Sequence, residues 1–405
     1  MTERSRILPQ SSSEPSLLVV IGLAVFTMVV VTTRFGIAEV GIIIALLGLL
    51  ARPQSLTAPA PFWWAMALVA WALVTSPWAI SPALAQQTCL DRLKVFVVFL
   101  VVINALRSWR YLRRYALFIV LCFMLYPARG TIINYLTGNK LAGRAIWNQI
   151  YSNPNDLGAM ALLAFGLALS ILAVRDEKRW AKVCAIFAAT SLLAIILLTQ
   201  SRGVFIGLIL GMGPAFLGSV RKRPAVTAGV VIMLALGSTL IPDTVWTRLS
   251  GIGKLTSTAT IAQADPEGSA AQRWEISKTG FRILEDHALV GVGLGCYSLA
   301  NARYAPKLGR RDTHDTYLNI AAELGLPGLV LWLGVVLSVL RRWWRSSRSQ
   351  LELPVQIVWL ERAILGFLVA GFFGTYSGIT MLYLMLGILW SGAMLVDTPK
   401  ELRAS

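Results

Sequence analysis

Long apolar runs recur along nearly the whole chain, and they limit it to one kind of fold. Many of them have about 17–25 residues, the length that a helix needs to cross the hydrocarbon core of a bilayer. Composition agrees with the runs, because 56% of the 405 residues are apolar and only 14% are charged. Soluble domains have about 45–50% apolar and about 25% charged residues. The sequence therefore predicts an integral membrane protein and excludes a soluble enzyme or a disordered chain.

The continuity of the runs indicates the class of membrane protein. Apolar and polar residues do not alternate over about ten positions, as they do in the strands of an outer-membrane barrel. Continuous runs indicate helices, whose backbone groups are hydrogen-bonded within the segment. We expect an all-α polytopic protein with about twelve transmembrane helices, near residues 17–33, 35–50, 62–80, 93–107, 114–127, 157–174, 182–200, 203–218, 225–241, 314–340, 356–376 and 379–396.

Clusters of Lys and Arg between the runs test this arrangement, because short cytoplasmic loops are rich in basic residues. If the amino end is cytoplasmic, every cluster in a short loop falls on that same side of the membrane. These clusters account for most of the formal net charge of +17, so nucleic acid is not an expected partner. Both termini are expected in the cytoplasm, with the phospholipid bilayer as a partner. The clusters are Arg107–Arg114, Arg175–Lys182, Arg221–Arg223 and Arg341–Arg348.

Two long segments, about 128–156 and about 242–313, lie on the opposite face, where a functional site is expected. The longer one precedes the tenth expected helix and forms a large outer loop. We divide the chain into helices one to seven over 1–198, a core over 199–396 that includes loop 242–313, and a short cytoplasmic tail over 397–405.

The large outer loop contains a helical patch and a glycine run. The patch extends from Gln272 to about His287, with Trp274, Phe281 and Leu284 near one face. The run Gly291–Gly295 has glycine at every second position, which permits tight backbone turns. It does not follow a strand of a βαβ unit, as a dinucleotide-binding fingerprint would. We expect this run to fold the loop back onto the membrane surface.

Arg202 is a basic residue that membrane topology does not explain. It stands in the short turn Thr199–Gly203 between two apolar runs, at the outer membrane boundary and without an acidic neighbour in sequence. A guanidinium at that depth is costly, so we expect it to face a cavity or a partner anion. Its planar fork of donors suits a phosphate or diphosphate carried by a lipid.

His314 is one of only two histidines and follows directly on a basic segment. An imidazole at the outer membrane boundary suits proton transfer, because its pKa is near neutral. Asp312 and Asp315 could orient the ring, or one of them could be the base. Glu323 lies about two and a half helical turns further on and could line the same cavity. The spacing matches no metal-binding motif, so we expect chemistry without a metal.

Three segments resemble the O-antigen ligases, within the wider group of O-antigen ligase, O-antigen polymerase and protein O-oligosaccharyltransferase membrane enzymes. Thr199–Gly203 looks like the Ser-Arg-Gly turn that opens their shared domain. His287–Gly295 looks like their Pro-hydrophobic-Gly-x-Gly-x-Gly segment. His314–Gly328 looks like their His-Asn-x-x-Leu and Glu-x-Gly-x-x-Gly segment. The resemblance covers about 199–330.

This resemblance implies a helical membrane glycosyltransferase of the GT-C type. It implies transfer of a finished glycan from undecaprenyl diphosphate to a sugar hydroxyl of lipid A-core, at the periplasmic face of a Gram-negative inner membrane. His314 matches the family's essential histidine, Arg202 its Ser-Arg-Gly arginine, and Arg273 its loop arginine. Two residues depart from the pattern: Asp315 replaces the usual Asn, and Ala288 an often-found Pro.

These matches fit a simple reaction. His314 would take the proton of the acceptor hydroxyl as that oxygen attacks the anomeric carbon with inversion, and Arg202 and Arg273 would neutralise the diphosphate leaving group. The donor already carries an activated phosphate bond, so neither ATP, a nucleotide sugar nor another cofactor is expected. Further basic residues of the outer face could bind the substrates, and these are Lys94, Arg129, Arg144, Arg310 and Arg311.

Three alternatives remain open at this point. An O-antigen polymerase would use a second lipid-linked glycan as the acceptor, and the sequence separates it only weakly from a ligase. A protein O-oligosaccharyltransferase usually has a sizeable domain after its last span, whereas about nine residues follow Val396 here. A secondary transporter of an organic anion could use Arg202 as a ligand, but the inverted repeats of such transporters are not evident.

Overall fold

Helices make up about four fifths of the part of the chain that the computed structural model describes, which is residues 15–32, 38–51, 56–174, 176–220, 269–348 and 357–397. Eleven of the twelve expected spans coincide with a helix, and the ninth, 225–241, lies outside the described residues. The helices are α1 (Leu17–Thr32), α2 (Ala38–Leu50), α3 (Ala60–Thr75), η2 (Ser76–Trp78), α4 (Pro82–Ala105), α5 (Trp109–Phe123), η3 (Met124–Ala128), α6 (Arg129–Leu136), η4 (Gln149–Tyr151), α7 (Pro154–Ala173), α8 (Arg179–Leu198), α9 (Arg202–Val220), α13 (Ser269–Asp286), α14 (Tyr297–Tyr304), α15 (Thr316–Arg348), α16 (Val358–Ala370), η6 (Gly371–Phe373) and α17 (Thr380–Asp397).

Within these ranges, six helical segments are long and apolar enough to cross a membrane, and α1, α2 and the first part of α9 are apolar but shorter. The protein is therefore a multi-pass helical membrane protein. The start of α4 was predicted wrongly, because the helix begins at Pro82 and not near residue 93. Its first turns carry polar residues such as Gln86 and Arg92, which interrupt the apolar run without interrupting the helix.

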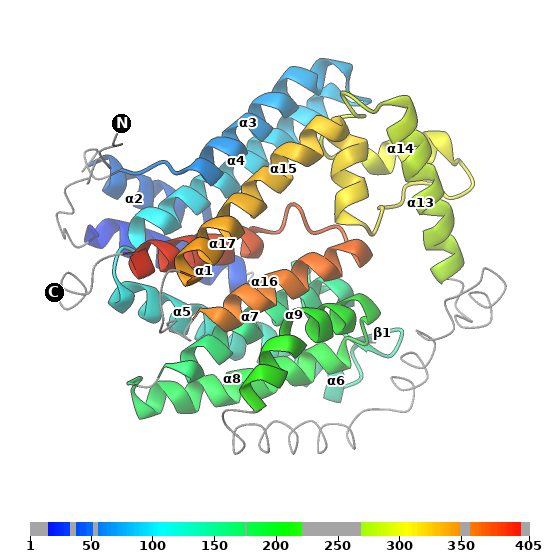
Figure 1. The fold of residues 1–405 in the computed structure, drawn as a ribbon. Helices are drawn as coiled ribbons and strands as arrows, with labels where there is room; N and C mark the ends of the chain where they lie inside the picture. Colours follow the sequence, from blue (N-terminus) through cyan, green and yellow to red (C-terminus); the bar gives the residue numbers. More distant parts are fainter. Residues whose placement is uncertain are drawn as a thin grey trace.

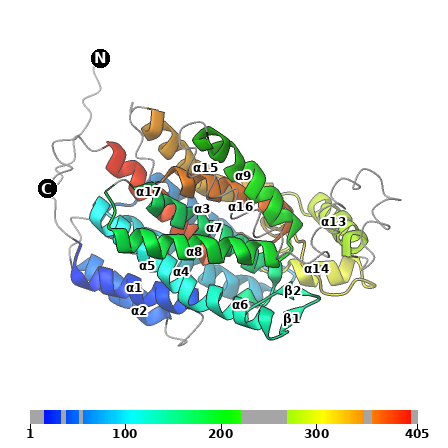
Figure 2. The same ribbon diagram turned by 90° about the horizontal axis from the view of Figure 1, so that it is seen from below.

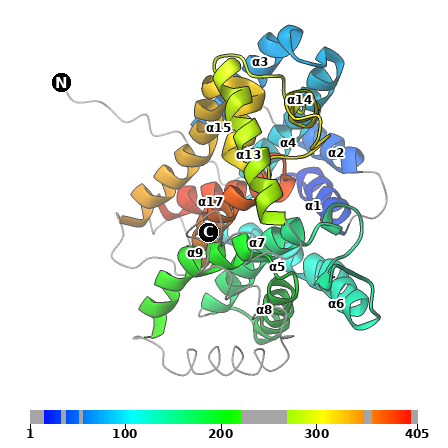
Figure 3. The same ribbon diagram turned by 90° about the vertical axis from the view of Figure 1, so that its right-hand side faces the viewer.

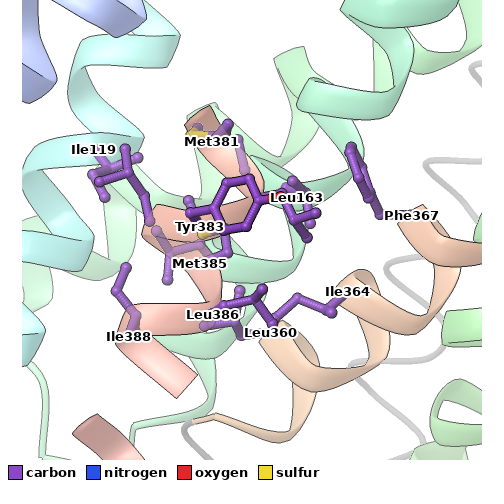
Figure 4. Close-up of a cluster of buried hydrophobic side chains, with 14 of the residues drawn as sticks. Ile119, Leu163, Leu360, Ile364, Phe367, Met381, Tyr383, Met385, Leu386 and Ile388 are labelled. Atoms are coloured by element: carbon purple, nitrogen blue, oxygen red, sulfur yellow. The ribbon is translucent and has the colours of Figure 1, made fainter. Parts of the chain in front are cut away.

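The two central helices are α7 and α17. In each of them 78% of the residues in an apolar stretch of 18 residues are buried, as expected for a helix that is apolar on all sides. Figure 4 shows Leu163 of α7 and Met385 of α17 in one cluster with Ile119 of α5 and Ile364 of α16. Helix α16 thus packs against both central helices.

Glycines allow α9 and α16 to pack closely. Gly203 and Gly207 are four residues apart and share one face of α9. A Cβ atom on Gly207 would lie 2.2 Å from the carbonyl oxygen of Gly366, and one on Gly203 would lie 2.4 Å from Cβ of Phe373. Small residues at this spacing let membrane helices approach each other closely. The contact places Arg202, the first residue of α9, beside the segment that joins α16 to α17.

The elements α13, α14 and a short hairpin gather at one end of the bundle (Figures 1 and 2). The hairpin pairs β1 (Lys140–Leu141) with β2 (Arg144–Ala145) and is a small addition to the all-α fold that the sequence predicts. Figure 3 looks onto this end and shows α13 running across the bundle.

Helix α13 confirms the expected helical patch, but a different face of it packs against the protein. Ile276 and Ile283 are buried, whereas Trp274 and Phe281 are exposed. The buried face meets α15, where the Leu318 side chain packs closely on Gly280 of α13. Periodicity alone could not distinguish the two faces, because both contain large apolar residues.

Helix α15 is interrupted at Gly325, and Figure 1 shows the bend that results. Gly325 has φ 71° and ψ −179°, which an α-helix does not accommodate. Two positions later, Pro327 has no N–H to donate to the carbonyl of Glu323. The break therefore frees backbone groups in a largely apolar environment, where each of them needs another partner.

The glycine run supplies those partners. The N–H groups of Val292 and Gly293 donate to the carbonyls of Ala322 and Glu323, each at 2.9 Å. Gly291, Gly293 and Gly295 all have positive φ, so the tight turns expected from the sequence are confirmed. The run packs on the broken helix.

Two more contacts complete the closure of the break. The Leu326 N–H donates to the Ala288 carbonyl at 2.8 Å. The indole of Trp71, on α3, donates to the Leu324 carbonyl at 2.8 Å. The outer elements are therefore joined to α15 by backbone hydrogen bonds, and the Trp71 side chain joins the same break to α3.

We expect Gly325→Ala to lower the melting temperature of the detergent-solubilised protein strongly, because the new Cβ would lie 2.1 Å from the Leu289 carbonyl oxygen. Gly138→Ala is a matched control, since Gly138 also has positive φ but no atom within 4 Å of the added Cβ. Gly138→Ala should lower the free energy of unfolding only by the backbone strain of about 1–2 kcal/mol. Equal melting temperatures for the two variants would contradict the tight closure at the break.

Candidate functional site

The turn that carries Arg202 is tightly anchored. Gln200 adopts φ 50°, a left-handed conformation that is uncommon for residues other than glycine, and reverses the chain between α8 and α9. Its side-chain amide donates to the Gly143 carbonyl in the hairpin at 3.3 Å. Arg202 is half-buried at the N-terminus of α9. Helix N-termini favour anions, so both the guanidinium and the helix would attract a phosphate group.

His314 lies in a second, equally constrained turn, immediately before α15. It has φ 53° and is half-buried. The neighbouring Thr313 is buried, and its hydroxyl donates to the Asp315 carbonyl at 2.9 Å and lies 3.1 Å from the Thr375 hydroxyl. Left-handed backbone at a non-glycine residue costs free energy and is frequent at functional sites. These bonds fix the backbone on both sides of His314.

The surroundings of this imidazole disfavour its charged form. Burial and the nearby guanidinium of Arg273 lower the pKa of His314 below its ordinary value, Asp312 opposes them, and Arg311 adds a smaller lowering. Arg273 is on α13 and is thus brought to His314 by the packing of α13 on α15. A neutral histidine can accept a proton, which is what a general base requires.

Arg144 contacts both the turn of Arg202 and the start of α7. Its Nε donates to the Thr199 carbonyl at 2.8 Å, and its Nη2 donates to Oδ1 of Asn155 at 2.7 Å. Asp156, Arg273 and Arg144 all lie close enough to the buried phenol of Tyr376 to act on it electrostatically. Residues from widely separated parts of the chain thus meet around Tyr376.

The remaining predicted substrate-binding residues have different surroundings. Lys94 is exposed and pairs with Asp91 at 3.1 Å and with Glu39 at 3.9 Å, so within the described part of the chain its charge is already compensated. Arg129 is exposed at the start of α6. Arg310 and Arg311 are exposed in the segment that leads into the His314 turn.

Three acidic residues were predicted to support His314, and each has distinct contacts. Asp315 is the N-cap of α15, because its Oδ1 accepts the N–H groups of Tyr317 at 2.8 Å and Leu318 at 3.0 Å. An Asn side chain, usual at this position of the pattern, caps helices equally well. Asp312 accepts the Thr313 N–H at 2.9 Å and acts on the imidazole electrostatically.

Glu323 is buried, and its carboxylate binds a backbone group of the protein itself. Its Oε1 accepts the Tyr297 N–H at 3.2 Å, at the start of α14. It therefore ties the end of the glycine run to the break in α15. Among the described residues, no three His, Cys, Asp or Glu side chains gather as a bound metal ion would require.

The sequence analysis missed several residues of this region. Tyr376 and Thr316 border apolar runs, and Asn155 stands in the polar stretch before α7, which was the signal available in the sequence. Arg92 was hidden by the late predicted start of α4. Its guanidinium donates to the Ser377 carbonyl, in the segment that joins α16 to α17.

Residues 186–333 match the family described as O-antigen ligase. The matched segment contains Arg202, Arg273 and His314. The chain thus carries an O-antigen ligase family domain, which confirms the family indicated by its motifs. Members of this family are membrane enzymes of the O-antigen ligase and polymerase type. No curated protein matches the chain.

We expect the His314 imidazole to titrate below about 6.5, the ordinary value for histidine. The chain has two histidines, so a His287→Gln background leaves one signal for NMR titration. Arg273→Gln should raise the pKa of His314, because it removes a positive charge that disfavours the imidazolium. Arg282→Gln, an exposed arginine on the same helix, is the control. Equal shifts in the two variants would contradict the proximity of Arg273.

Proposed function

We propose that the protein is an O-antigen ligase that transfers a preassembled glycan from undecaprenyl diphosphate to a sugar hydroxyl of lipid A-core, which completes lipopolysaccharide. The observation that carries the proposal is the O-antigen ligase domain over residues 186–333, in which His314 and Arg273 lie close enough to interact electrostatically. In this proposal the fold is of the GT-C type, the site faces the periplasm, and both termini are on the cytoplasmic side of the inner membrane.

In the proposed reaction, His314 accepts the proton of the acceptor hydroxyl while that oxygen attacks the anomeric carbon. The bond from this carbon to the diphosphate oxygen breaks, and undecaprenyl diphosphate leaves with the bonding electron pair. Arg202 and Arg273 stabilise the negative charge that develops on the diphosphate. Attack opposite the leaving group inverts the anomeric configuration. The imidazolium then releases its proton to solvent, and no step requires ATP or a nucleotide sugar.

The acceptor is the phosphorylated lipid A-core. Arg310 and Arg311 are the best candidates for its phosphates, since both are exposed and adjoin the His314 turn. Lys94 and Arg144 are weaker candidates, because acidic or amide groups of the protein already bind their charged ends. Arg129 is exposed at the start of α6 and remains a candidate.

Purified protein should transfer glycan from undecaprenyl diphosphate to lipid A-core in detergent with a chelator present. His314→Ala should lower the turnover rate by about 10²–10⁴-fold, the usual contribution of a positioned general base. His287→Ala is the matched control, since His287 contacts Tyr304 and should not affect transfer. Gel analysis of the lipid A-core product checks the expectation. Longer lipid-linked glycans in place of this product would indicate a polymerase, and anion uptake by vesicles without any transfer would indicate a transporter.

Arg202→Ala and Arg273→Ala should each lower kcat by an amount equivalent to about 2.7–4 kcal/mol, because each removes a charge that faces the developing diphosphate. Steady-state kinetics with varied donor and fixed acceptor measure the effect. Arg202→Lys should recover part of the rate but lack the bidentate geometry. Arg282→Ala, which removes an exposed charge from α13, should leave the rate near that of the wild type.

A further inference from the structure

The turns of Arg202 and His314 belong to distant parts of the chain, and a continuous series of hydrogen bonds connects them. Its first part starts at the Thr199 carbonyl, in the turn before Arg202. Arg144 donates to this carbonyl at 2.8 Å and to Oδ1 of Asn155 at 2.7 Å. The hairpin thereby fixes the turn of Arg202 against the first turn of α7.

The second part connects the same asparagine to the turn of His314. The phenol of Tyr376 donates to the Asn155 carbonyl at 3.3 Å. The Tyr376 N–H donates to Oγ1 of Thr316 at 2.9 Å, and this hydroxyl donates to the Gly374 carbonyl at 2.6 Å. Thr316 is the first residue of α15, two positions after His314. One hydroxyl group thus joins the segment between α16 and α17 to the helix that carries the His314 turn.

The Thr316 side chain can hold neighbouring backbone segments in place through hydrogen bonds, in addition to filling the space between them. Its side chain is buried, with 2% of its surface exposed, and its hydroxyl is both a donor and an acceptor. Valine has nearly the same shape but would leave the Tyr376 N–H and the Gly374 carbonyl without this partner. Buried polar groups that lose their partner favour rearrangement of the backbone around them. The rearrangement would occur within two residues of His314.

We propose that Thr316 is a positioning residue for glycan transfer, which sets the location of His314 relative to Arg202 through Tyr376, Asn155 and Arg144. The proposal rests on the proposed function, because it assigns those two residues to one reaction. A displacement of a reacting group by about 1 Å can reduce a rate by about a hundredfold. Thr316 therefore affects the chemical step without touching the substrate.

The experiment compares three full-length variants in detergent: Thr316→Val, Thr316→Ser and Thr27→Val. Thr27 is the matched control, because it is also fully buried and its hydroxyl lies 2.6 Å from the Tyr115 hydroxyl, between α1 and α5. Thr316→Val should lower kcat about ten- to a hundredfold, with less than about a twofold change in the donor KM. Thr316→Ser retains the hydroxyl and should restore most of kcat. Thr27→Val should keep the wild-type kcat.

A second measurement does not depend on activity. Amide hydrogen exchange of peptides that cover residues 199–203 and 311–318 should increase in both places in Thr316→Val, and in neither place in Thr27→Val. The proposal is overturned if Thr316→Val loses no more kcat than Thr27→Val, or if exchange increases at 311–318 alone. If Thr316→Val does not fold, Tyr376→Phe replaces it, and wild-type kcat with wild-type exchange in that variant overturns the proposal.

Failure of the proposed function has a different signature. If the wild type forms no lipid A-core product, the ligase assignment fails, while the exchange experiment still tests the connection between the two turns. If exchange increases at both turns in Thr316→Val but the wild type transfers no glycan, the hydrogen-bonded connection between the turns stands. Its role in catalysis does not, and the proposal for Thr316 is overturned.

Discussion

The interruption of α15 is the constraint on which the rest of the structure depends. Gly325 and Pro327 end the first part of a helix inside an apolar environment, where unpaired backbone groups are costly. The N–H groups of Val292 and Gly293 and the indole of Trp71 satisfy the carbonyls that the break exposes. Because these partners come from the outer loop and from α3, closing the break also docks α13 and α14 onto the bundle.

This docking determines the chemistry available at the outer end. Arg273 reaches the neighbourhood of His314 only because α13 packs on the first part of α15. Burial and the positive charge then disfavour the imidazolium, while Asp312 partly compensates for them. A base is more useful when it is neutral, and the same arginine can face an anionic leaving group, so one contact serves both requirements.

Sequence patterns were informative where a property belongs to a single segment. Run lengths located helices at all eleven expected positions that the structure describes, because burial of apolar side chains and internal hydrogen bonding act within each helix. The same reasoning failed for the start of α4, where polar residues such as Arg92 bind groups on other segments. For α13 the pattern predicted the helix but not the face that packs, because both faces contain apolar residues and contact with α15 selects one.

The amino-acid sequence by itself determined the class of the protein, its family motifs, and the prominence of Arg202 and His314, since these follow from composition and local spacing. The tertiary structure alone decided which residues accompany them. Nothing in the local sequence connects Arg144, Asn155, Tyr376 and Thr316, which are up to 232 positions apart along the numbering (376 − 144). They meet because the ends of α7, α15, α16 and the hairpin converge at one end of the bundle, where buried polar groups must bind one another.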